Sequence, residues 1–388
     1  MKRKEFLTDM VLAGTAAMMI PSLAKANAFG LGTAKKIRIG LIGCGSVSGV
    51  YLPHLTKSPY VEVVSVCDIK PERAKARAEQ FQIPNQYPHI DQMLAGAEFD
   101  LMINLTNMQE HGRLNKIALL KRKNIWSEKP LANSYKEGLA LLELSKKQNV
   151  RIWGAPAVVN SPQFAFMAKQ INEGKLGKVA AAHAHYGHLG PTWSAFFYEN
   201  GGGSLPDLGV YNLTTLTGLL GPVKSVVAMT NILTPERTVD DKGKITVEAE
   251  DNASILMEHF SGALSHVMCG FNYFDPYGHQ GKGQDKPTVS IVGTKGAMHL
   301  IGYDWMPFAV ELATIDHEEP QRFSTDPGSY VWQQGASVIS ESMAEGHEPL
   351  INVEHSLHIL EIIEAARRSQ KEGIRVPLVS KFPYPVVS

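Results

Sequence analysis

In the first 153 residues, short apolar runs typical of strands alternate with segments whose apolar residues have helical spacing. Short apolar runs rich in β-branched residues predict buried strands, at 36–42, 61–67, 101–105, 124–127 and 150–153. Between them, apolar residues spaced three and four apart predict helices, at 47–57, 71–81, 111–123 and 135–148. Strands that alternate with helices predict an α/β domain built on a doubly wound parallel sheet.

The pattern changes after residue 153. Strand-like runs follow one another with few helices between them, at 178–186, 223–231, 253–260, 263–271 and 288–292. Ser261-Gly262 separates two of these runs and predicts a tight hairpin turn. A late amphipathic helix is predicted over 353–372. We therefore expect a second, α+β domain over 154–388 with a largely antiparallel open sheet, which would bind substrate and support oligomerisation.

The composition argues against a nucleic-acid partner and against a membrane-spanning segment after the N-terminus. The chain has 388 residues, with 38 basic and 38 acidic side chains and no formal net charge. Because no basic run or patch stands out, we expect no nucleic-acid partner. Beyond the N-terminus, no apolar stretch is long enough to span a bilayer.

The first 28 residues predict a signal peptide. A basic segment at 2–4, an apolar segment at 10–23 and the small residues Ala26-Asn27-Ala28 follow in the order of such a peptide. Lys4 stands where a twin-arginine export signal has its second arginine, so Tat and Sec export both stay open. We expect a periplasmic protein with a short arm at 29–35; the alternative is a cytosolic protein with an amphipathic N-terminal helix.

A glycine-rich loop at 43–49 follows the first predicted strand and opens the first helix, as a dinucleotide-binding fingerprint requires. Gly43 allows the tight turn, and Gly45 lets the backbone approach a pyrophosphate. Asp68 ends the second strand, where a carboxylate accepts from both ribose hydroxyls and repels a 2′-phosphate. We expect a Rossmann domain over 36–153 that binds NAD in preference to NADP. The residues expected to contact NAD are Gly43, Gly45, Ser46, Val47, Ser48 and Asp68.

Four segments resemble the Gfo/Idh/MocA oxidoreductases, which act on sugars, inositols and related polyols. They are 43–45, Thr106 with His111, Glu-Lys-Pro-Leu-Ala at 128–132, and 201–211. The resemblance runs from about residue 36 to 378 and implies cofactor contacts by Thr106, Asn107, His111, Glu128 and Lys129. Two segments depart from the family: Asn107-Met108 replaces its usual Pro-Asn, and 157–162 lacks its usual Asn and Arg.

The family's acid/base histidine is replaced by Tyr211, as in its glucose–fructose oxidoreductase and dihydrodiol dehydrogenase branches. Asp207 and Tyr211 are four positions apart, so on a helix they share one face. Tyrosine, with a pKa of about 10, is a poor base, and a nearby Lys129 ammonium would lower that pKa. We expect Tyr211 as acid/base, Lys129 as its activator and donor to the reacting oxygen, and Asp207 as the group that orients Lys129 or a sugar hydroxyl.

Two alternatives stay open for these groups: Lys129 and Tyr211 could exchange roles, because coupled groups share their titration, or Tyr211 could be a packed aromatic without a chemical role. Glu128 is expected to position Lys129 or the nicotinamide ribose.

Three histidines form a second cluster, and His183 and His185 share one face of a predicted strand. No carboxylate or cysteine nearby completes a metal site, so we expect no metal. We expect His185 and His188 to contact sugar hydroxyls, with a structural role as the alternative. Trp193 is expected to stack on a sugar ring, or else to form a core or subunit contact.

Together these features predict an exported NAD-dependent oxidoreductase that acts on a secondary hydroxyl of a sugar or glycoside. Outside the cytoplasm there is no free cofactor pool, so the NAD would be held tightly and recycled by a second carbohydrate. We expect a homodimer or homotetramer joined through an exposed sheet face. Two alternatives are an NAD-dependent glycoside hydrolase that uses transient C3 oxidation and elimination, and a non-catalytic carbohydrate-binding protein.

Overall fold

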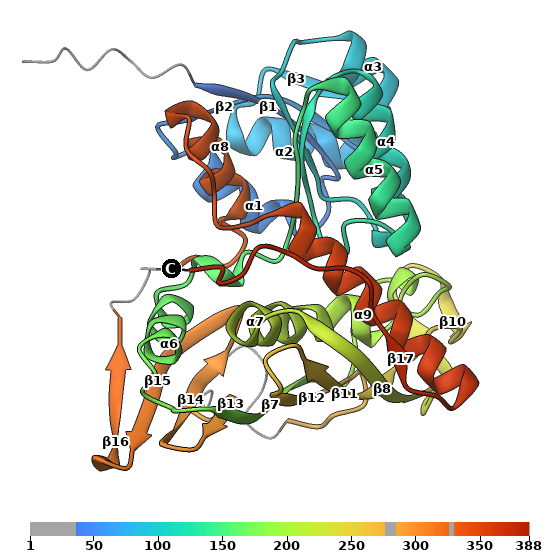
Figure 1. The fold of residues 1–388 in the computed structure, drawn as a ribbon. Helices are drawn as coiled ribbons and strands as arrows, with labels where there is room; N and C mark the ends of the chain where they lie inside the picture. The colour runs from blue at the N-terminus through green and yellow to red at the C-terminus, as the bar shows by residue number, and fades with distance from the viewer. Residues whose placement is uncertain (1–35, 276–284, 326–329, 388) are drawn as a thin grey trace, which may run out of the picture. The chain divides into compact units, whose positions relative to one another are not determined.

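The computed structural model describes residues 36–275, 285–325 and 330–387 (Figure 1). The predicted signal peptide and the arm at 29–35 lie outside these residues. Within the described part of the chain, no helix combines the length and the apolar character needed to cross a bilayer.

Six parallel strands form the N-terminal sheet, in the order β3-β2-β1-β4-β5-β6, which confirms the predicted doubly wound fold. The strands are β1 (Ile37–Ile42), β2 (Val61–Cys67), β3 (Asn85–Tyr87), β4 (Leu101–Asn104), β5 (Asn124–Ser127) and β6 (Ile152–Gly154). The helices are α1 (Ser48–Leu55), α2 (Pro71–Phe81), α3 (Ile90–Ala95), α4 (His111–Leu120) and α5 (Tyr135–Gln148). The sequence pattern missed only β3 and α3, which are too short to show a period.

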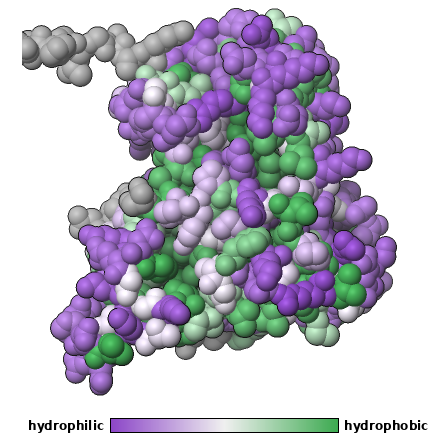
Figure 2. Space-filling model, viewed as in Figure 1, coloured by the Kyte–Doolittle hydropathy of each residue, from purple (hydrophilic) through white to green (hydrophobic). Residues whose placement is uncertain are grey.

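The order of the strands reverses between β1 and β4. The chain runs outward from β1 to β3, then returns to the other side of β1 and continues through β4 to β6. In sheets of this kind, ligands bind outside the carboxyl ends of the strands at the reversal. Hydrophilic side chains predominate on the surface over α4 and α5 (Figure 2). The strand ends at the reversal are therefore the expected place for a ligand in this domain.

Nine strands form the second sheet, in the order β16-β15-β14-β13-β7-β12-β11-β8-β17. Only β7 and β12 pair in parallel within this described sheet, so the expected largely antiparallel architecture is confirmed. The strands are β7 (Val179–Gly187), β8 (Val223–Asn231), β11 (Asn252–His259), β12 (Leu264–Gly270), β13 (Pro287–Gly293), β14 (Gly296–Tyr303), β15 (Met306–Thr314), β16 (His317–Ser324) and β17 (Val376–Pro377). A separate hairpin joins β9 (Glu236–Val239) and β10 (Gly243–Thr246).

The predicted hairpin at Ser261-Gly262 is present. It joins β11 to β12, and Gly262 has the left-handed φ of 88° that glycine adopts without strain.

The second domain holds more helices than the pattern predicted: α6 (Pro162–Asn172), α7 (Val210–Leu220), α8 (Gly335–Glu345) and α9 (Val353–Glu372). Of these four helices the sequence pattern predicted only α9, and its predicted bounds, 353–372, agree with the structure. Every residue of α7 is buried, so it shows no alternation of apolar and polar faces from which a helix could be read. Helix α8 returns to the N-terminal domain, where it packs on α1, β1 and β2 (Figure 1).

Candidate active site

Lys129 lies just beyond the carboxyl end of β5, at the edge where the strand order reverses. Its ammonium donates to the Asp207 carboxylate (Nζ to Oδ1, 2.6 Å) and to the Asp207 carbonyl oxygen (2.8 Å). The two side chains are only 12% and 10% exposed, so this ion pair is largely shielded from water. A lysine of the N-terminal domain is thereby tied to the second domain.

A π-helical turn at Leu205–Gly209 presents Asp207 and leads directly into α7, which carries Tyr211. Such turns widen a helix locally and often occur at functional sites. The Lys129 ammonium lies 5.3 Å from the centroid of the Tyr211 ring, within range of a cation–π contact. The structure therefore brings Lys129, Asp207 and Tyr211 together, although they come from different domains.

The expectation that Lys129 lowers the pKa of Tyr211 is wrong. Burial, followed by the negative charge of Glu128, raises the pKa of this phenol well above its usual value. The Lys129 ammonium, 5.3 Å from the ring centroid, does not offset these effects. Tyr211 is thus a neutral phenol, which can donate a hydrogen bond to a substrate oxygen but cannot take up its proton as a base. This arrangement favours the exchange of roles that the sequence left open.

Glu128 is held in a buried network that sequence reasoning missed. The Tyr51 hydroxyl donates to Glu128 Oε1 (2.7 Å), and the Trp126 indole N–H donates to the Tyr51 oxygen (2.9 Å). The other carboxylate oxygen accepts from the Lys129 backbone N–H (3.0 Å). Glu128 therefore fixes the backbone that carries Lys129. Tyr51 occupies an apolar position of α1, so nothing in the sequence pattern distinguishes it from a core residue.

The glycine loop passes very close to the end of β4. Gly43 has a φ of 95°, and a Cβ there would lie 2.5 Å from the Leu105 carbonyl. At Gly45, by contrast, a Cβ would meet only Arg73, at 4.0 Å, so this backbone stays open to a ligand. The Ser48 hydroxyl closes the loop by donating to the Gly45 carbonyl (2.6 Å), and it accepts from Arg77 Nε (2.9 Å).

The carboxylate of Asp68, which follows β2, contacts the same glycine loop. Its oxygens accept from the backbone N–H groups of Cys44 and Lys70, each at 2.8 Å, so the carboxylate both shapes the loop and stands where a ribose would bind. Ser46 is exposed and Val47 half-buried just before α1, and the Val47 side chain does not cap that helix. An open glycine backbone, a helix start and a carboxylate after β2 together fit NAD.

Thr106, Asn107 and His111 follow β4. The Thr106 hydroxyl donates to Asn104 (2.7 Å), and His111 lies between the carbonyls of Pro130 (2.7 Å) and Thr106 (2.9 Å). Burial lowers the pKa of His111 in spite of these acceptors. His111 therefore braces the loop after β4 against the loop after β5, whereas Asn107 is exposed beside them.

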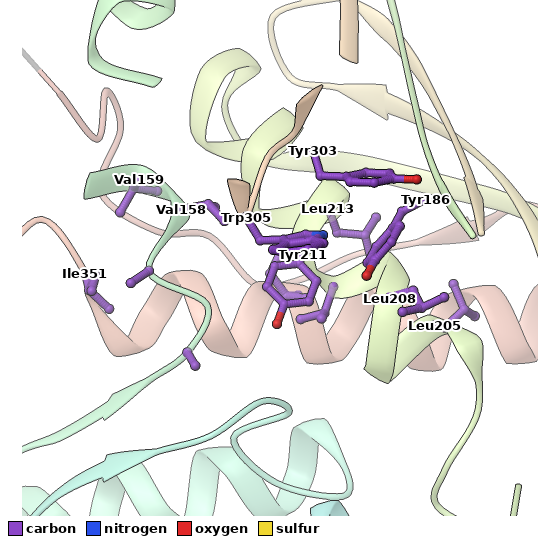
Figure 3. Close-up of a cluster of buried hydrophobic side chains, with 14 of the residues drawn as sticks. Val158, Val159, Tyr186, Leu205, Leu208, Tyr211, Leu213, Tyr303, Trp305 and Ile351 are labelled. Carbon is purple, nitrogen blue, oxygen red and sulfur yellow. The ribbon is translucent and has the colours of Figure 1, made fainter. Parts of the chain in front are cut away.

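Aromatic rings of the second domain surround Tyr211 (Figure 3). Tyr186 on β7 lies 6.2 Å from Tyr211 and 4.7 Å from Tyr303, and Tyr303 is stacked nearly parallel on Trp305. Trp332, which precedes α8, donates its indole N–H to the Tyr211 oxygen at 3.3 Å. Sequence reasoning missed Tyr186, Tyr303, Trp305 and Trp332, because they come from strands and a connection whose pairing the sequence does not state.

His185 and His188, both predicted to contact sugar hydroxyls, lie in different surroundings. Side chains alternate along a strand, so His185 lies on the face of β7 opposite Tyr186, where it stacks near His183 (5.7 Å). His183 in turn contacts His266 (Nδ1 to Nδ1, 2.9 Å). The structure therefore places His185 on the strand face opposite Tyr186, and its expected contact with a sugar hydroxyl stays a prediction. His188 follows β7 and lies 6.0 Å from the Tyr186 ring, at the edge of the aromatic cluster.

Trp193 is 48% exposed and packs edge-on against Phe197 (4.6 Å). The loop that carries these residues also contacts the N-terminal domain, because Gln109 donates to the Phe196 carbonyl (2.7 Å). No group of three or more His, Cys, Asp or Glu side chains within 36–275, 285–325 and 330–387 is arranged to hold a metal ion.

Two family models match the chain. One describes an oxidoreductase family with an NAD-binding Rossmann fold, over residues 37–155, and the other the GFO/IDH/MocA C-terminal domain, over 164–299. D-apiose dehydrogenase of Paraburkholderia graminis is 23% identical over 361 residues, which covers 90% of this chain and 91% of that protein.

Solved structures that share the fold include the following two. The aldose–aldose oxidoreductase from Caulobacter crescentus, complexed with glycerol, has a TM-score of 0.75 at 21% identity and covers 89% of this chain and 100% of its own. Levoglucosan dehydrogenase, complexed with NADH and levoglucosan, has a TM-score of 0.76 at 20% identity, covering 88% and 99%.

Proposed function

Because this chain belongs to the Gfo/Idh/MocA family of oxidoreductases and carries its NAD-binding Rossmann domain, we propose that it oxidises or reduces a secondary hydroxyl group of a sugar or glycoside. One observation carries the proposal: Lys129, Asp207 and Tyr211 meet at the carboxyl end of β5, beside the strand reversal where a dinucleotide binds.

NAD, when bound, supplies the hydride acceptor or donor. The chain must then move one proton between the substrate oxygen and a side chain. We assign this proton transfer to Lys129, which Asp207 orients through two hydrogen bonds. The ammonium donates the proton when the substrate is reduced, and the neutral amine takes it up when the hydroxyl is oxidised. Tyr211, as a neutral phenol, donates a hydrogen bond to the same oxygen. Glu128 supports the pair by holding the Lys129 backbone.

The relatives' names support a sugar as substrate, since they include apiose, an aldose pair and levoglucosan. The ring of Trp193, which is 48% exposed, supplies a flat apolar face of the kind that stacks on sugar rings. His188 lies close enough to this cluster to contact a sugar hydroxyl.

Export remains part of the proposal and rests on residues 1–28 alone, whose three regions have the order of a signal peptide. In the periplasm the NAD would be retained and restored by a second carbohydrate. Self-association is proposed through the second-domain sheet, where Leu256, Leu264 and Met229 are 58%, 58% and 76% exposed on neighbouring strands.

The test is an absorbance spectrum of the purified protein for bound nicotinamide, followed by incubation with sugars and glucosides. Appearance of reduced nicotinamide with an intact glycosidic bond supports the proposal. Release of free sugar would instead indicate the hydrolase mechanism, which needs an added base for the C2 proton. Absence of bound cofactor and of any affinity for NAD would favour a binding protein without catalysis.

The catalytic roles of Lys129 and Tyr211 are tested by substitution, independently of the assays for bound cofactor and substrate. With cofactor bound, Lys129→Met should abolish turnover, and Tyr211→Phe should reduce it while NAD affinity stays the same. Unchanged turnover in Tyr211→Phe would remove that residue from the mechanism.

A further inference from the structure

The Tyr211 oxygen accepts a hydrogen bond from a residue 121 positions away in the chain, the indole N–H of Trp332 (3.3 Å). An indole can only donate, whereas a phenol can both donate and accept. The phenol oxygen must therefore be the acceptor in this contact. Its own proton consequently points away from Trp332.

That proton has no partner within the described residues, because no described side chain or carbonyl accepts from Tyr211. Two of the three ammonium protons of Lys129 are taken up by Asp207, which leaves the third beside the Tyr211 ring. Figure 3 shows the Tyr211 hydroxyl pointing away from the stacked rings of Tyr303 and Trp305. One phenol proton and one ammonium proton are thus uncommitted at the same place.

Trp332 is itself tightly held. It packs on Trp305, with ring centroids 5.0 Å apart. The next residue, Gln333, is buried and has a φ of 68°, a left-handed conformation that a residue with a side chain adopts only under constraint. A connection under this constraint defines the direction of the indole N–H well.

The same connection also contacts the support of Lys129. Gly335 begins α8 against Trp126, where a Cβ on residue 335 would lie 2.2 Å from the Trp126 ring. Trp126 donates to Tyr51, which donates to Glu128. The four residues 332–335 therefore contact both the Tyr211 hydroxyl and the network that carries Lys129.

We propose that Trp332 is a positioning residue of the reaction: it holds the Tyr211 oxygen as an acceptor, so that the phenol proton is directed to the substrate oxygen beside Lys129. This inference rests on the proposed function. It adds a residue outside the matched family segments, supplied by the connection to α8.

The kinetic test compares Trp332→Phe, which keeps an aromatic ring but removes the N–H, with Trp153→Phe, which makes the same change in the core of the N-terminal domain. A hydrogen bond of this kind is worth about 1 kcal/mol, so kcat should fall roughly 3- to 10-fold in Trp332→Phe, with KM for sugar and the Kd of NAD unchanged. The indole N–H stabilises the phenolate, so its loss should move any basic limb of the kcat–pH profile upward.

A second measurement does not depend on activity. The chain has five tryptophans, and their indole N–H groups give separate NMR resonances. Trp332→Phe identifies the Trp332 resonance, and Tyr211→Phe should shift that resonance more than the other four. The signal should also exchange slowly with solvent.

The results separate the two proposals. A shifted indole resonance with no dehydrogenase activity on any sugar overturns the proposed function but retains the contact. An unshifted resonance, or activity with the same kcat and pH profile in Trp332→Phe and wild type, overturns the positioning role. A fall in kcat that Trp153→Phe reproduces would also overturn it, because general destabilisation would then explain the loss.

Discussion

The pair formed by Lys129 and Asp207 gives the sharpest test of the site. Lys129→Met removes the ammonium and leaves the Asp207 carboxylate in a setting only 10% exposed. Asp207→Asn removes the negative charge but keeps an acceptor oxygen, and the backbone carbonyl of residue 207 still accepts from Lys129. The double variant removes both charges, so neither partner is left buried and unpaired.

The burial of the ion pair determines how much unfolding free energy each variant should lose. Loss of one partner of a buried ion pair destabilises a protein by about 3–5 kcal/mol, and we expect about 3 kcal/mol for Lys129→Met. Asp207→Asn should cost about 1.5 kcal/mol, the lower end for a hydrogen bond to a charged group. The double variant should lose only about 2 kcal/mol, because the uncompensated carboxylate is gone. The expected coupling is therefore about 2.5 kcal/mol.

Urea unfolding of the three variants and wild type measures this coupling, provided that NAD is removed first, since a bound ligand adds its own stabilisation. Turnover is measured on the same proteins. We expect Asp207→Asn to keep NAD affinity while kcat falls roughly 10- to 100-fold, the kinetic equivalent of about 1.4–2.8 kcal/mol. Free energies that add within about 0.5 kcal/mol would show that the two charges do not interact, and would refute the site as described.

Three further predictions test the cofactor loop and the core. Asp68→Asn should raise the Kd of NAD about 10-fold or more but leave NADP binding almost unchanged, by calorimetry; an equal loss for both would contradict the ribose contact. Gly43→Ala should destabilise the fold by about 2 kcal/mol or more, because its Cβ would meet Leu105, whereas Gly262→Ala, with open space around it, should lose about 1 kcal/mol. Burial raises the pKa of Asp304 to about 6. The folded state then binds this proton more tightly than the unfolded chain, so the free energy of unfolding should fall as pH rises from about 3 to 7, by about 3 kcal/mol. Asp304→Asn should lack this contribution, and the same pH dependence in both proteins would exclude Asp304 as its source.

The candidates in the N-terminal half of the site came from local signals. Gly43, Gly45 and Asp68 were found from their order along the chain, because a glycine loop after a strand and a carboxylate after the next strand are consequences of local sequence. Helix α9 was predicted because half of its surface is polar, whereas α7, the helix that carries Tyr211, has no polar face and gave no signal. The resemblance at 201–211, rather than any periodicity, pointed to Asp207 and Tyr211.

The sequence by itself determined the order of strands and helices in the first domain, the change to a strand-rich second domain and the residue types available for chemistry, since these depend on neighbours along the chain. Only the tertiary structure decided which of those residues meet. It brought His183 against His266 of another strand, placed Trp332 against Tyr211, and set the burial that raises the pKa of that phenol. Burial and charge at Tyr211 are sums over groups from both domains, so no local pattern around residue 211 could have revealed them.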